Sequence, residues 1–362
     1  MKTFKIRLFE PYVGKEELNQ TLKVLKTKFW ASGSGQGQVK KFELALKKYI
    51  TCIDVIAVNS GTAALHLALS NFDIALKDVM IPTLTFVSTA HAAIYNNAKP
   101  IFVDIDEKTL CIDLDDLERK ITKNTKIIIP VHFGGFPCDL EKIKKLKNEF
   151  KFHVIEDASH AFGATYKGKK IGKHSELVCF SFHPVKNLSA PTGGAIAINN
   201  DMIRKDELNS KRWCGITDRK ESLYDVDKLG WNFYMNEISA TIGLVQLKRI
   251  NILNNRRKKI AKQYYKKITL EHKMPFSEEC SYHLYWIRVK NRDEFMKKMR
   301  RCGIETGIHY KPVHQMKFYF KEGRKLEKAD NIWTELVSIP MHPNLTMNDV
   351  EEIITNVNNF AC

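Results

Sequence analysis

The sequence predicts an α/β fold, with a mostly parallel sheet flanked by helices and a smaller α/β domain at the C-terminal end. From about residue 15 to residue 200, short apolar runs alternate with helical patterns, as a parallel sheet covered on both faces requires. Beyond a long helical segment the alternation begins again, from about residue 250. A chain of 362 residues is long enough to bury two such cores.

Seven short apolar runs are the expected strands of the large sheet. They cover residues 54–58, 78–82, 99–104, 126–131, 153–157, 177–182 and 194–198. Helical patterns fill the gaps between the earlier runs, at residues 61–72, 87–97, 114–121 and 140–150. Because consecutive elements pack next to one another, these segments favour one α/β core over several small domains.

The C-terminal third has its own pattern. A glycine-poor helical segment leads out of the core from Asn236 to about residue 268, and a strand, a helix and a terminal helix are expected at 282–289, 292–303 and 346–360. In the terminal helix, one face collects Met347, Val350, Ile353, Ile354 and Val357. We therefore expect a large domain over residues 1–250 and a small domain over residues 251–362.

The chain is basic, with 58 Lys and Arg against 41 Asp and Glu and a formal net charge of +17. The lysines are interleaved with apolar residues along nearly every predicted helix, which is typical of solvated helix faces. No nucleic-acid-binding motif accompanies them, so we expect no nucleic-acid partner. A basic exterior would nevertheless attract an anionic substrate such as a nucleotide diphosphate.

Cysteine usage and hydropathy bound the cellular location. The eight cysteines are scattered, without a CxxC pair or a zinc-ligand spacing, so neither a disulfide framework nor a metal site is expected. The opening MKTFKIRLFEPYVG lacks the apolar core of a signal peptide, and no apolar run approaches membrane-spanning length. We expect a cytoplasmic protein without membrane attachment.

A first candidate site follows the strand at 54–58. Ligands of open α/β sheets bind beyond the carboxyl ends of the strands, and this strand runs through NSGT into an Ala/Leu-rich helix. Gly61 and Thr62 could cradle a phosphate, because glycine lets the backbone come close and the free amides of the first turn point at the anion. The alternative is an ordinary helix cap at Ser60 or Thr62.

Two further strand ends carry candidate chemistry. Asp157 ends one strand, shortly before His160, and a carboxylate there can keep a pyridine ring protonated, although it could also cap the next loop. Ser181 and Lys186 leave the strand at 177–182. A lysine in a desolvated, cation-rich pocket loses basicity and can form a Schiff base, whereas the alternative is one more surface lysine.

A fourth cluster lies in the small domain, in the segment TGIHYKPVHQM. His309, Tyr310 and His314 could contact a sugar or a phosphate, and the alternative is a pair of buried, hydrogen-bonded histidines. The four places together supply an anion cradle, a carboxylate for a ring nitrogen, a phosphate-binding serine and a Schiff-base lysine, which are the parts of a single site.

With these motifs the sequence resembles the DegT/DnrJ/EryC1/StrS family of sugar aminotransferases, which have the fold-type I architecture and use pyridoxal 5'-phosphate (PLP). The resemblance extends over essentially the whole chain. Its motifs are NSGTAALHLAL, IPTLTFVSTAHA, VIEDASHAFGATYKGKKIG, FSFHPVKN, LGWNFYMNEISATIGLVQL and GIETGIHYKPVH.

The resemblance implies a role for each matching residue. Lys186 would hold PLP as a Schiff base and move protons, and the cofactor would pass through its pyridoxamine form. Asp157 would pair with the pyridine nitrogen, with His160 near the ring hydroxyl. The other cofactor contacts would be Gly61, Thr62 and Ser181 at the phosphate, Phe86 on the ring, and Asn232 reaching a phosphate across a homodimer interface.

The resemblance also implies the reaction. An amino donor, expected to be L-glutamate, would aminate a nucleotide-diphosphate-linked keto sugar, supplying an amino sugar for glycans or a secondary metabolite. The alternatives are a PLP-dependent sugar dehydratase, a branch in which histidine replaces the lysine kept here, and a non-enzymatic regulator. Departures at Pro191, Thr192 and Tyr234, where many members carry an acidic residue and an arginine, concern substrate contacts.

Overall fold

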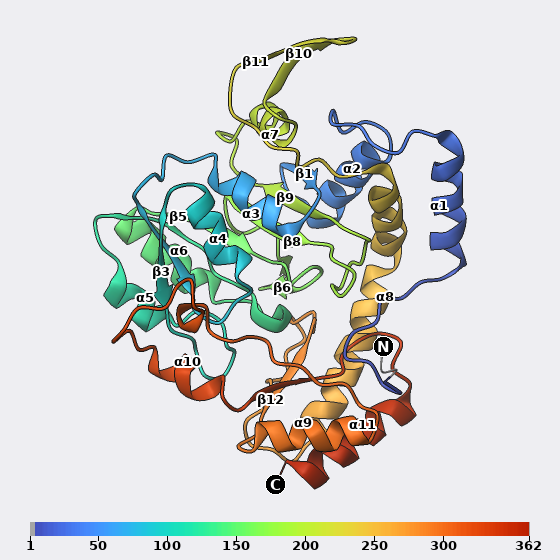
Figure 1. Ribbon diagram of the computed structural model, residues 1–362, viewed down its shortest axis with the longest axis vertical. Coiled ribbons are helices and arrows are strands. Elements are labelled where there is room, and N and C mark those ends of the chain that lie inside the picture. The colour runs from blue at the N-terminus through green and yellow to red at the C-terminus, as the bar shows by residue number, and fades with distance from the viewer. Residues whose placement is uncertain (1–3, 362) are drawn as a thin grey trace.

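The computed structural model of the protein describes residues 4–361, and within them seven strands form one sheet in the order β1-β9-β8-β5-β4-β2-β3 (Figure 1). Only β9 runs antiparallel to its neighbours in this sheet, so the prediction of a mostly parallel sheet is confirmed. Each strand overlaps its expected range. The strands are β1 (Asp54–Val58), β2 (Asp78–Pro82), β3 (Lys99–Val103), β4 (Thr125–Ile128), β5 (His153–Asp157), β8 (Leu177–Ser181) and β9 (Gly194–Ile198).

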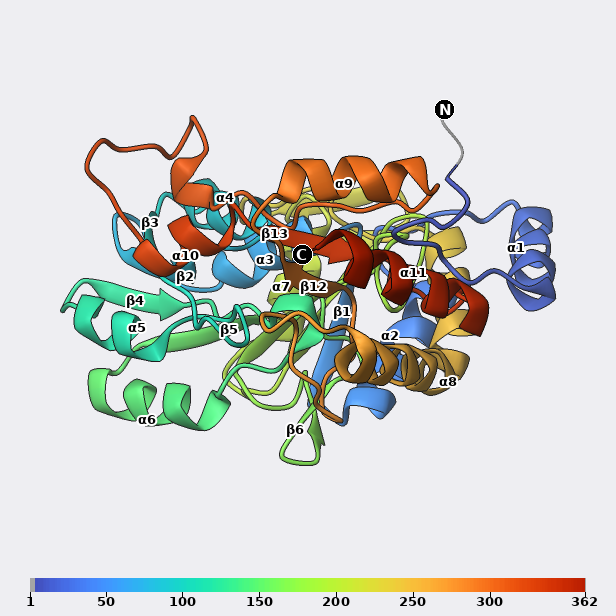
Figure 2. The ribbon, with the colours of Figure 1, turned by 90° about the horizontal axis from the view of Figure 1, so that it is seen from below.

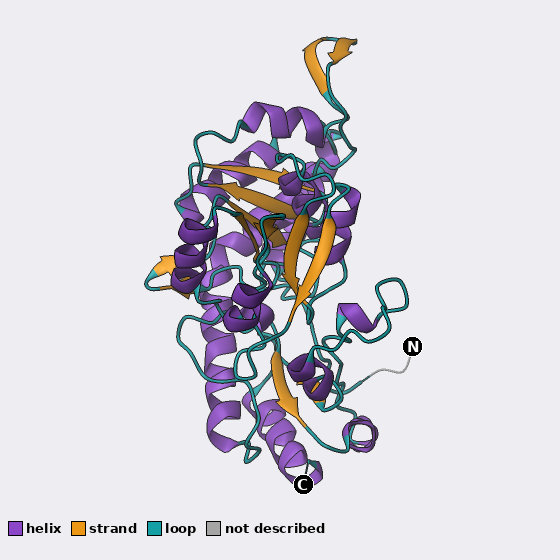
Figure 3. Ribbon diagram, turned by 90° about the vertical axis from the view of Figure 1, so that its left-hand side faces the viewer, coloured by secondary structure: helices purple, strands orange, loops and turns teal. Residues whose placement is uncertain are grey.

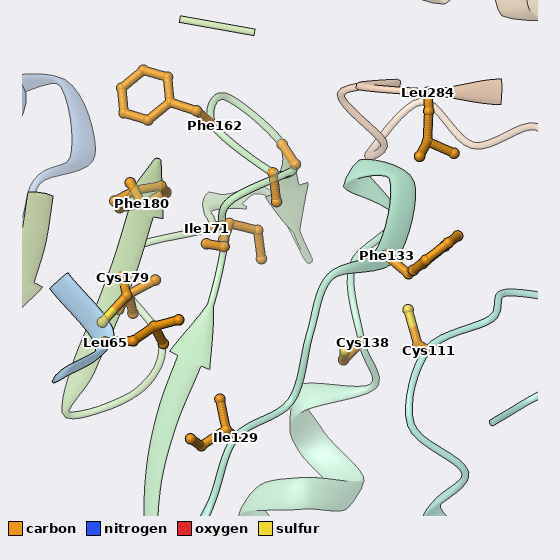
Figure 4. Close-up of a cluster of buried hydrophobic side chains, with 14 of the residues drawn as sticks. Leu65, Cys111, Ile129, Phe133, Cys138, Phe162, Ile171, Cys179, Phe180 and Leu284 are labelled. Atoms are coloured by element: carbon orange, nitrogen blue, oxygen red, sulfur yellow. The ribbon is translucent and has the colours of Figure 1, made fainter. Parts of the chain in front are cut away.

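The strands read as unbroken apolar runs because helices cover both faces of the sheet. In β9 every residue is buried, and in β1 all but the first. Figure 3 shows the strands enclosed by helices, and Figure 4 shows Cys179 and Phe180 of β8 in the apolar cluster with Leu65. Helix α2 (Gln38–Ile50) packs against β1, and α3 (Gly61–Leu69) packs against β8 and β9.

Side chains at the helix starts explain where several helices begin. Asp113 accepts hydrogen bonds from the first amides of α5 and Asp139 does so for α6, as capping residues do. In α6, Leu140, Ile143 and Leu146 form the buried face, and the lysines lie between them in the sequence, on the outer part of the helix. The other helices of this region are α1 (Lys15–Thr27), α4 (Ser88–Tyr95), α5 (Leu114–Lys120), η1 (Phe133–Gly135), α6 (Leu140–Phe150) and α7 (Lys205–Arg212).

Two small hairpins leave the body of the protein. One pairs β6 (Thr165–Tyr166) with β7 (Lys169–Lys170). The other pairs β10 (Ile216–Lys220) with β11 (Leu223–Val226) and projects beyond α7 at the top of Figure 1. The apolar side chains of Leu223, Tyr224 and Val226 are exposed on it.

The C-terminal part is built on the long helix α8 (Glu237–Lys267), which starts at the cap Asn236. This single helix contacts α2 in the large sheet region and α11 in the C-terminal region. Figure 2 shows α9 and α11 beside the antiparallel pair β12–β13. The remaining elements are β12 (Tyr285–Arg288), α9 (Arg292–Arg301), η2 (Val313–Gln315), α10 (Glu327–Ile332), β13 (Leu336–Ile339) and α11 (Met347–Phe360).

Two details refine the expected C-terminal organisation. Met347 was expected on the buried face of the last helix, but its side chain is 55% exposed because it occupies the first position of α11. The expected domain boundary at residue 250 falls inside α8, and the N-terminal Ile6 pairs with Ile304. The division into domains 1–250 and 251–362 stays a prediction.

The structure of residues 4–361 bears on membrane attachment and on the state of the cysteines. No helix in this range is both long and apolar enough to cross a membrane. The cysteines described there are free thiols, and Cys362 lies outside the described residues.

Candidate active site

A cavity of about 360 Å³ lies where β1, β5 and β8 end, with one wall formed by the C-terminal part of the chain. This is the edge of the sheet at which ligands of open α/β folds bind. Nine of the predicted site residues line it: Gly61, Thr62, Phe86, Asp157, His160, Ser181, Lys186, His309 and Tyr310. Residues from separate strands therefore meet in one place.

One end of the cavity is the start of α3. The hydroxyl of Ser60 accepts a hydrogen bond from the amide of Ala63 at 3.0 Å, so Ser60 is the helix cap. A Cβ atom on Gly61 would lie only 2.7 Å from the Cβ of Ser181, so glycine is what lets β8 approach this turn. The cap and the cradle are compatible, because the first amides of a helix have no intrahelical acceptor and can bind an anion.

Asp157 reaches the cavity from the end of β5 and is 4% exposed. Its Oδ2 accepts a hydrogen bond from the hydroxyl of Thr89 at 2.8 Å, and its Oδ1 accepts one from the amide of Ser159 at 3.1 Å. Glu156 points to the opposite face of the strand, where it binds His132 at 2.8 Å. Asp157 is therefore the carboxylate that β5 presents to a ligand.

Lys186 lies in the loop after β8 and is half-buried. The loop is held by the amide of Lys186, which donates to the carbonyl of His183, and by the hydroxyl of Ser189, which donates to the carbonyl of Lys186. Burial lowers the pKa of Lys186 to about 8, although the nearby charge of Asp157 acts in the opposite direction. The amine is thus more nucleophilic near neutral pH than that of a solvated lysine.

Aromatic and imidazole rings form another wall of the cavity. The amide of Gly134 donates to Nδ1 of His160, so Nε2 carries the proton and donates to the hydroxyl of Tyr310 at 3.2 Å. The ring of Phe86 meets Tyr310 edge-on at 6.0 Å and is 55% exposed. Burial, followed by the charge of Lys186, lowers the pKa of His309 to about 4, so this ring is neutral at physiological pH.

Two predicted site residues are not among those lining the cavity. His314 is buried, with Nδ1 2.6 Å from the hydroxyl of Thr83 and Nε2 3.0 Å from Asp330. Asn232 is exposed, and its carbonyl accepts a hydrogen bond from the side chain of Asn59. A substrate contact by His314 and a contact across a dimer interface by Asn232 stay predictions.

Two residues at the site had no distinguishing signal in the sequence. Thr89 orients Asp157 from 68 residues away, and Nε2 of His283 lies 3.4 Å from Nζ of Lys186 across 97 residues. Threonine and histidine are common in folded chains, so only the strand order that brings these segments together identifies them.

The residues present fit PLP. The cofactor requires an amine for its aldehyde, a carboxylate for its ring nitrogen and an anion site for its phosphate. Lys186, Asp157 and the turn at Gly61 offer these three groups around one cavity. Its volume lies within the usual range for small-molecule sites, roughly 300 to 1,000 Å³.

Comparison with known proteins identifies the family of the chain. A model of the DegT/DnrJ/EryC1/StrS aminotransferase family matches residues 11–358. The uncharacterized protein MJ1066 of Methanocaldococcus jannaschii is 33% identical over 373 residues, covering 96% of each chain.

Solved structures give the same result. PseC of Helicobacter pylori, an aminotransferase involved in the biosynthesis of pseudoaminic acid, matches with a TM-score of 0.93 at 27% identity over 99% of both chains. Spr1654 of Streptococcus pneumoniae, solved in a PLP-form, matches with a TM-score of 0.90 at 26% identity over 99% of this chain and 98% of that one. The chain therefore belongs to the DegT/DnrJ/EryC1/StrS aminotransferase family, whose members are fold-type I, PLP-dependent sugar aminotransferases.

Proposed function

We propose that this protein transfers an amino group from L-glutamate to a keto sugar carried on a nucleotide diphosphate, producing an amino sugar for glycans or a secondary metabolite. The observation that carries the proposal is the meeting of Lys186, Asp157 and the α3 turn at Gly61 around a single cavity. Each group alone is common, but the three together match the aldehyde, ring nitrogen and phosphate of PLP.

PLP, when bound, supplies an electron sink, and the protein positions and polarises the reacting groups. The amine of Lys186 would hold PLP through its aldehyde and would carry a proton between donor and cofactor, for which a pKa of about 8 is suitable. Asp157 stabilises a proton on the ring nitrogen, and Thr89 keeps the carboxylate in place. Ser181 and the amides at Gly61 and Thr62 bind the phosphate.

The proposed substrate class rests on observations other than the catalytic residues. The net charge of +17 favours a substrate with a nucleotide diphosphate, and PseC is an aminotransferase involved in the biosynthesis of pseudoaminic acid. His309 and Tyr310, which line the same cavity as Phe86, are the proposed sugar contacts. We further propose a homodimer with Asn232 completing the partner's site, working in the cytoplasm.

The test is amino transfer itself. The purified protein is incubated with PLP, ¹⁵N-labelled L-glutamate and a panel of nucleotide-linked keto sugars, and the products are read by mass spectrometry. We expect one sugar class to gain the labelled nitrogen. Lys186→Ala should abolish the gain, whereas Lys173→Ala, which removes an exposed lysine, should not.

Other outcomes assign other functions. A product that loses water without gaining nitrogen would identify a dehydratase. A wild-type protein that binds PLP but aminates no sugar of the panel would contradict the proposal, and a protein that stays colourless with PLP would favour a non-enzymatic role.

A further inference from the structure

His283 is the buried neighbour of the amine of Lys186. It is 1% exposed, and its Nε2 lies 3.4 Å from Nζ of Lys186. Its ring is stacked on Phe9, with centroids 5.3 Å apart and planes at 12°, and it contacts the ring of His160 at 4.3 Å. The imidazole therefore cannot turn without disturbing both neighbours.

Backbone hydrogen bonds hold the segment that carries His283 in place. The amide of His283 donates to the carbonyl of Gly134 at 2.9 Å, while the amide of Gly134 donates to Nδ1 of His160 at 3.3 Å. Gly134 has φ +64, and a Cβ there would press on Met274 and Leu284 at 3.0 and 3.2 Å. Phe133 and Leu284, labelled in Figure 4, anchor this turn in the apolar cluster. One turn thus positions both histidines.

The protonation state of His283 follows from its surroundings. Burial lowers its pKa well below the usual value, so the ring is neutral at physiological pH. A neutral imidazole has one donor and one acceptor nitrogen, and an amine that carries hydrogens needs the acceptor. The charged or titratable groups that affect the pKa of Lys186 or His283 include Asp157, His160, His309 and Arg257, and the charge of Lys186 also lowers the pKa of His183.

Arg257 of α8 adds to this effect from behind the site. It is 3% exposed, and its Nε and Nη1 atoms have no hydrogen-bond partner among residues 4–361. A buried cation of this kind opposes a second positive charge on His283. After burial, Lys186, His160 and His309, it makes the smallest contribution to keeping the His283 ring neutral.

We propose that His283 is a positioning residue whose unprotonated Nε2 accepts a hydrogen bond from Nζ of Lys186 and holds the amine at the cavity wall. The inference rests on the proposed function, because it takes Lys186 as the amine that binds PLP. A lysine side chain loses considerable rotamer freedom when it is fixed, and an acceptor at its tip selects one orientation before the aldehyde arrives.

The test compares two substitutions in the apoprotein. His283→Phe keeps a stacked ring without an acceptor, and His283→Gln restores an acceptor without the ring. At a pH above the midpoints of both proteins, where the amine is neutral in each, Phe should slow Schiff-base formation with PLP, followed by absorbance, about tenfold, which is the loss of one hydrogen bond. Acylation of Lys186, read by peptide mass spectrometry against pH, should have a lower midpoint in the Phe variant, because a neutral acceptor stabilises the ammonium form. In the Gln variant, the rate of Schiff-base formation and the midpoint of acylation should both return most of the way to the wild-type values.

The outcomes separate this inference from the proposed function. If wild-type Lys186 forms no Schiff base, the proposed function fails. If it does, and the Phe variant matches the wild type in both rate and midpoint, His283 has no positioning role. Should the Phe variant not fold, ¹⁵N-histidine NMR of the wild type decides, with the His283 signal identified by its loss in the Gln variant. A proton on Nδ1 is expected, and a proton on Nε2 would overturn the inference.

Discussion

The hydroxyl of Thr89 donates a hydrogen bond to Oδ2 of Asp157 over 2.8 Å; both side chains are buried, and Asp157 lines the cavity. The amide of Ser159 holds the other oxygen. The carboxylate is therefore oriented before a ligand binds, and groups oriented in advance need no rearrangement during reaction. Thr89 itself bonds to Thr85, which extends the support into α4 and the loop before it.

Thr89→Val should lower kcat/KM for amino transfer by about tenfold, because a hydrogen bond to a charged group contributes roughly 1.5 to 3 kcal/mol. Asp157→Asn should lower it by at least about 100-fold, since the charge that balances the ring nitrogen is lost. Steady-state kinetics with a fixed sugar and varied donor measures both. Thr89→Ser keeps the hydroxyl and serves as the control, and full activity in the Val variant would contradict this role of Thr89.

A buried ion pair between α2 and α7 should matter for stability. Nη1 of Arg212 lies 2.6 Å from Oε1 of Glu43, and the two residues are 1% and 3% exposed. Both bond to the backbone of Ala57 in β1. Arg212→Met leaves the buried carboxylate with only the more distant Lys205, 3.9 Å from Oε2, as a cation, so the free energy of unfolding should fall by about 3 kcal/mol, the lower end of the range for a broken buried pair.

Urea denaturation at fixed protein concentration measures this loss. The double variant Glu43→Leu/Arg212→Met should be more stable than Arg212→Met alone, because no unpaired charge remains. A double variant less stable than both single variants would mean that the pair stabilises the fold through something other than charge compensation.

The large sheet was predictable because its strands are short, mostly apolar runs that are largely buried, with the edge strand β3 the most exposed. The direction of β9 was not, since its sequence GAIAI carries nothing that distinguishes a parallel from an antiparallel neighbour. Lys186 and Asp157 could be named because each follows a strand at the edge where ligands bind. His283 follows a loop 97 residues from Lys186, and its place depends on the turn at Gly134. His314 shows the converse: its motif suggested a ligand contact, while its ring nitrogens face Thr83 and Asp330.

Glu176 should make stability depend on acid pH. Burial alone would raise its pKa, but hydrogen bonds from His153 and Lys147 lower it to about 2. A carboxylate with a depressed folded-state pKa adds stability above its unfolded value of about 4.3, and this is lost as the pH falls toward 2. Glu176→Gln should therefore be less stable than the wild type at pH 7, by about 1 to 2 kcal/mol after solvent screening of this half-buried group.

The difference should shrink steadily between pH 4.5 and pH 2, as urea denaturation at several pH values can show. Glu149→Gln, an exposed change on α6, is the control and should leave the pH profile of stability unchanged. A Glu176→Gln variant whose deficit is constant from pH 7 to pH 2.5 would show that the carboxylate is not the origin of the effect.

The proposed sharing of the active site between two subunits can be tested with mixed dimers. Lys186→Ala and Asn232→Ala should each be nearly inactive alone, because one removes the nucleophile and the other the proposed contact with the partner's phosphate. Co-refolding the two should restore about one quarter of wild-type activity, since random pairing makes about half of the dimers mixed and each mixed dimer holds one intact site.

Mixing restores activity only if Lys186 and Asn232 of one site come from different subunits, however much each residue contributes to catalysis. If each site were built from a single chain, every site in a mixed dimer would still carry one of the two substitutions, and activity would stay at the level of the parents. The exposed position of Asn232 at the base of the β10–β11 hairpin favours the shared arrangement. Mixing Lys186→Ala with Asp157→Ala, two residues of the same cavity wall, is the matched control and should restore nothing.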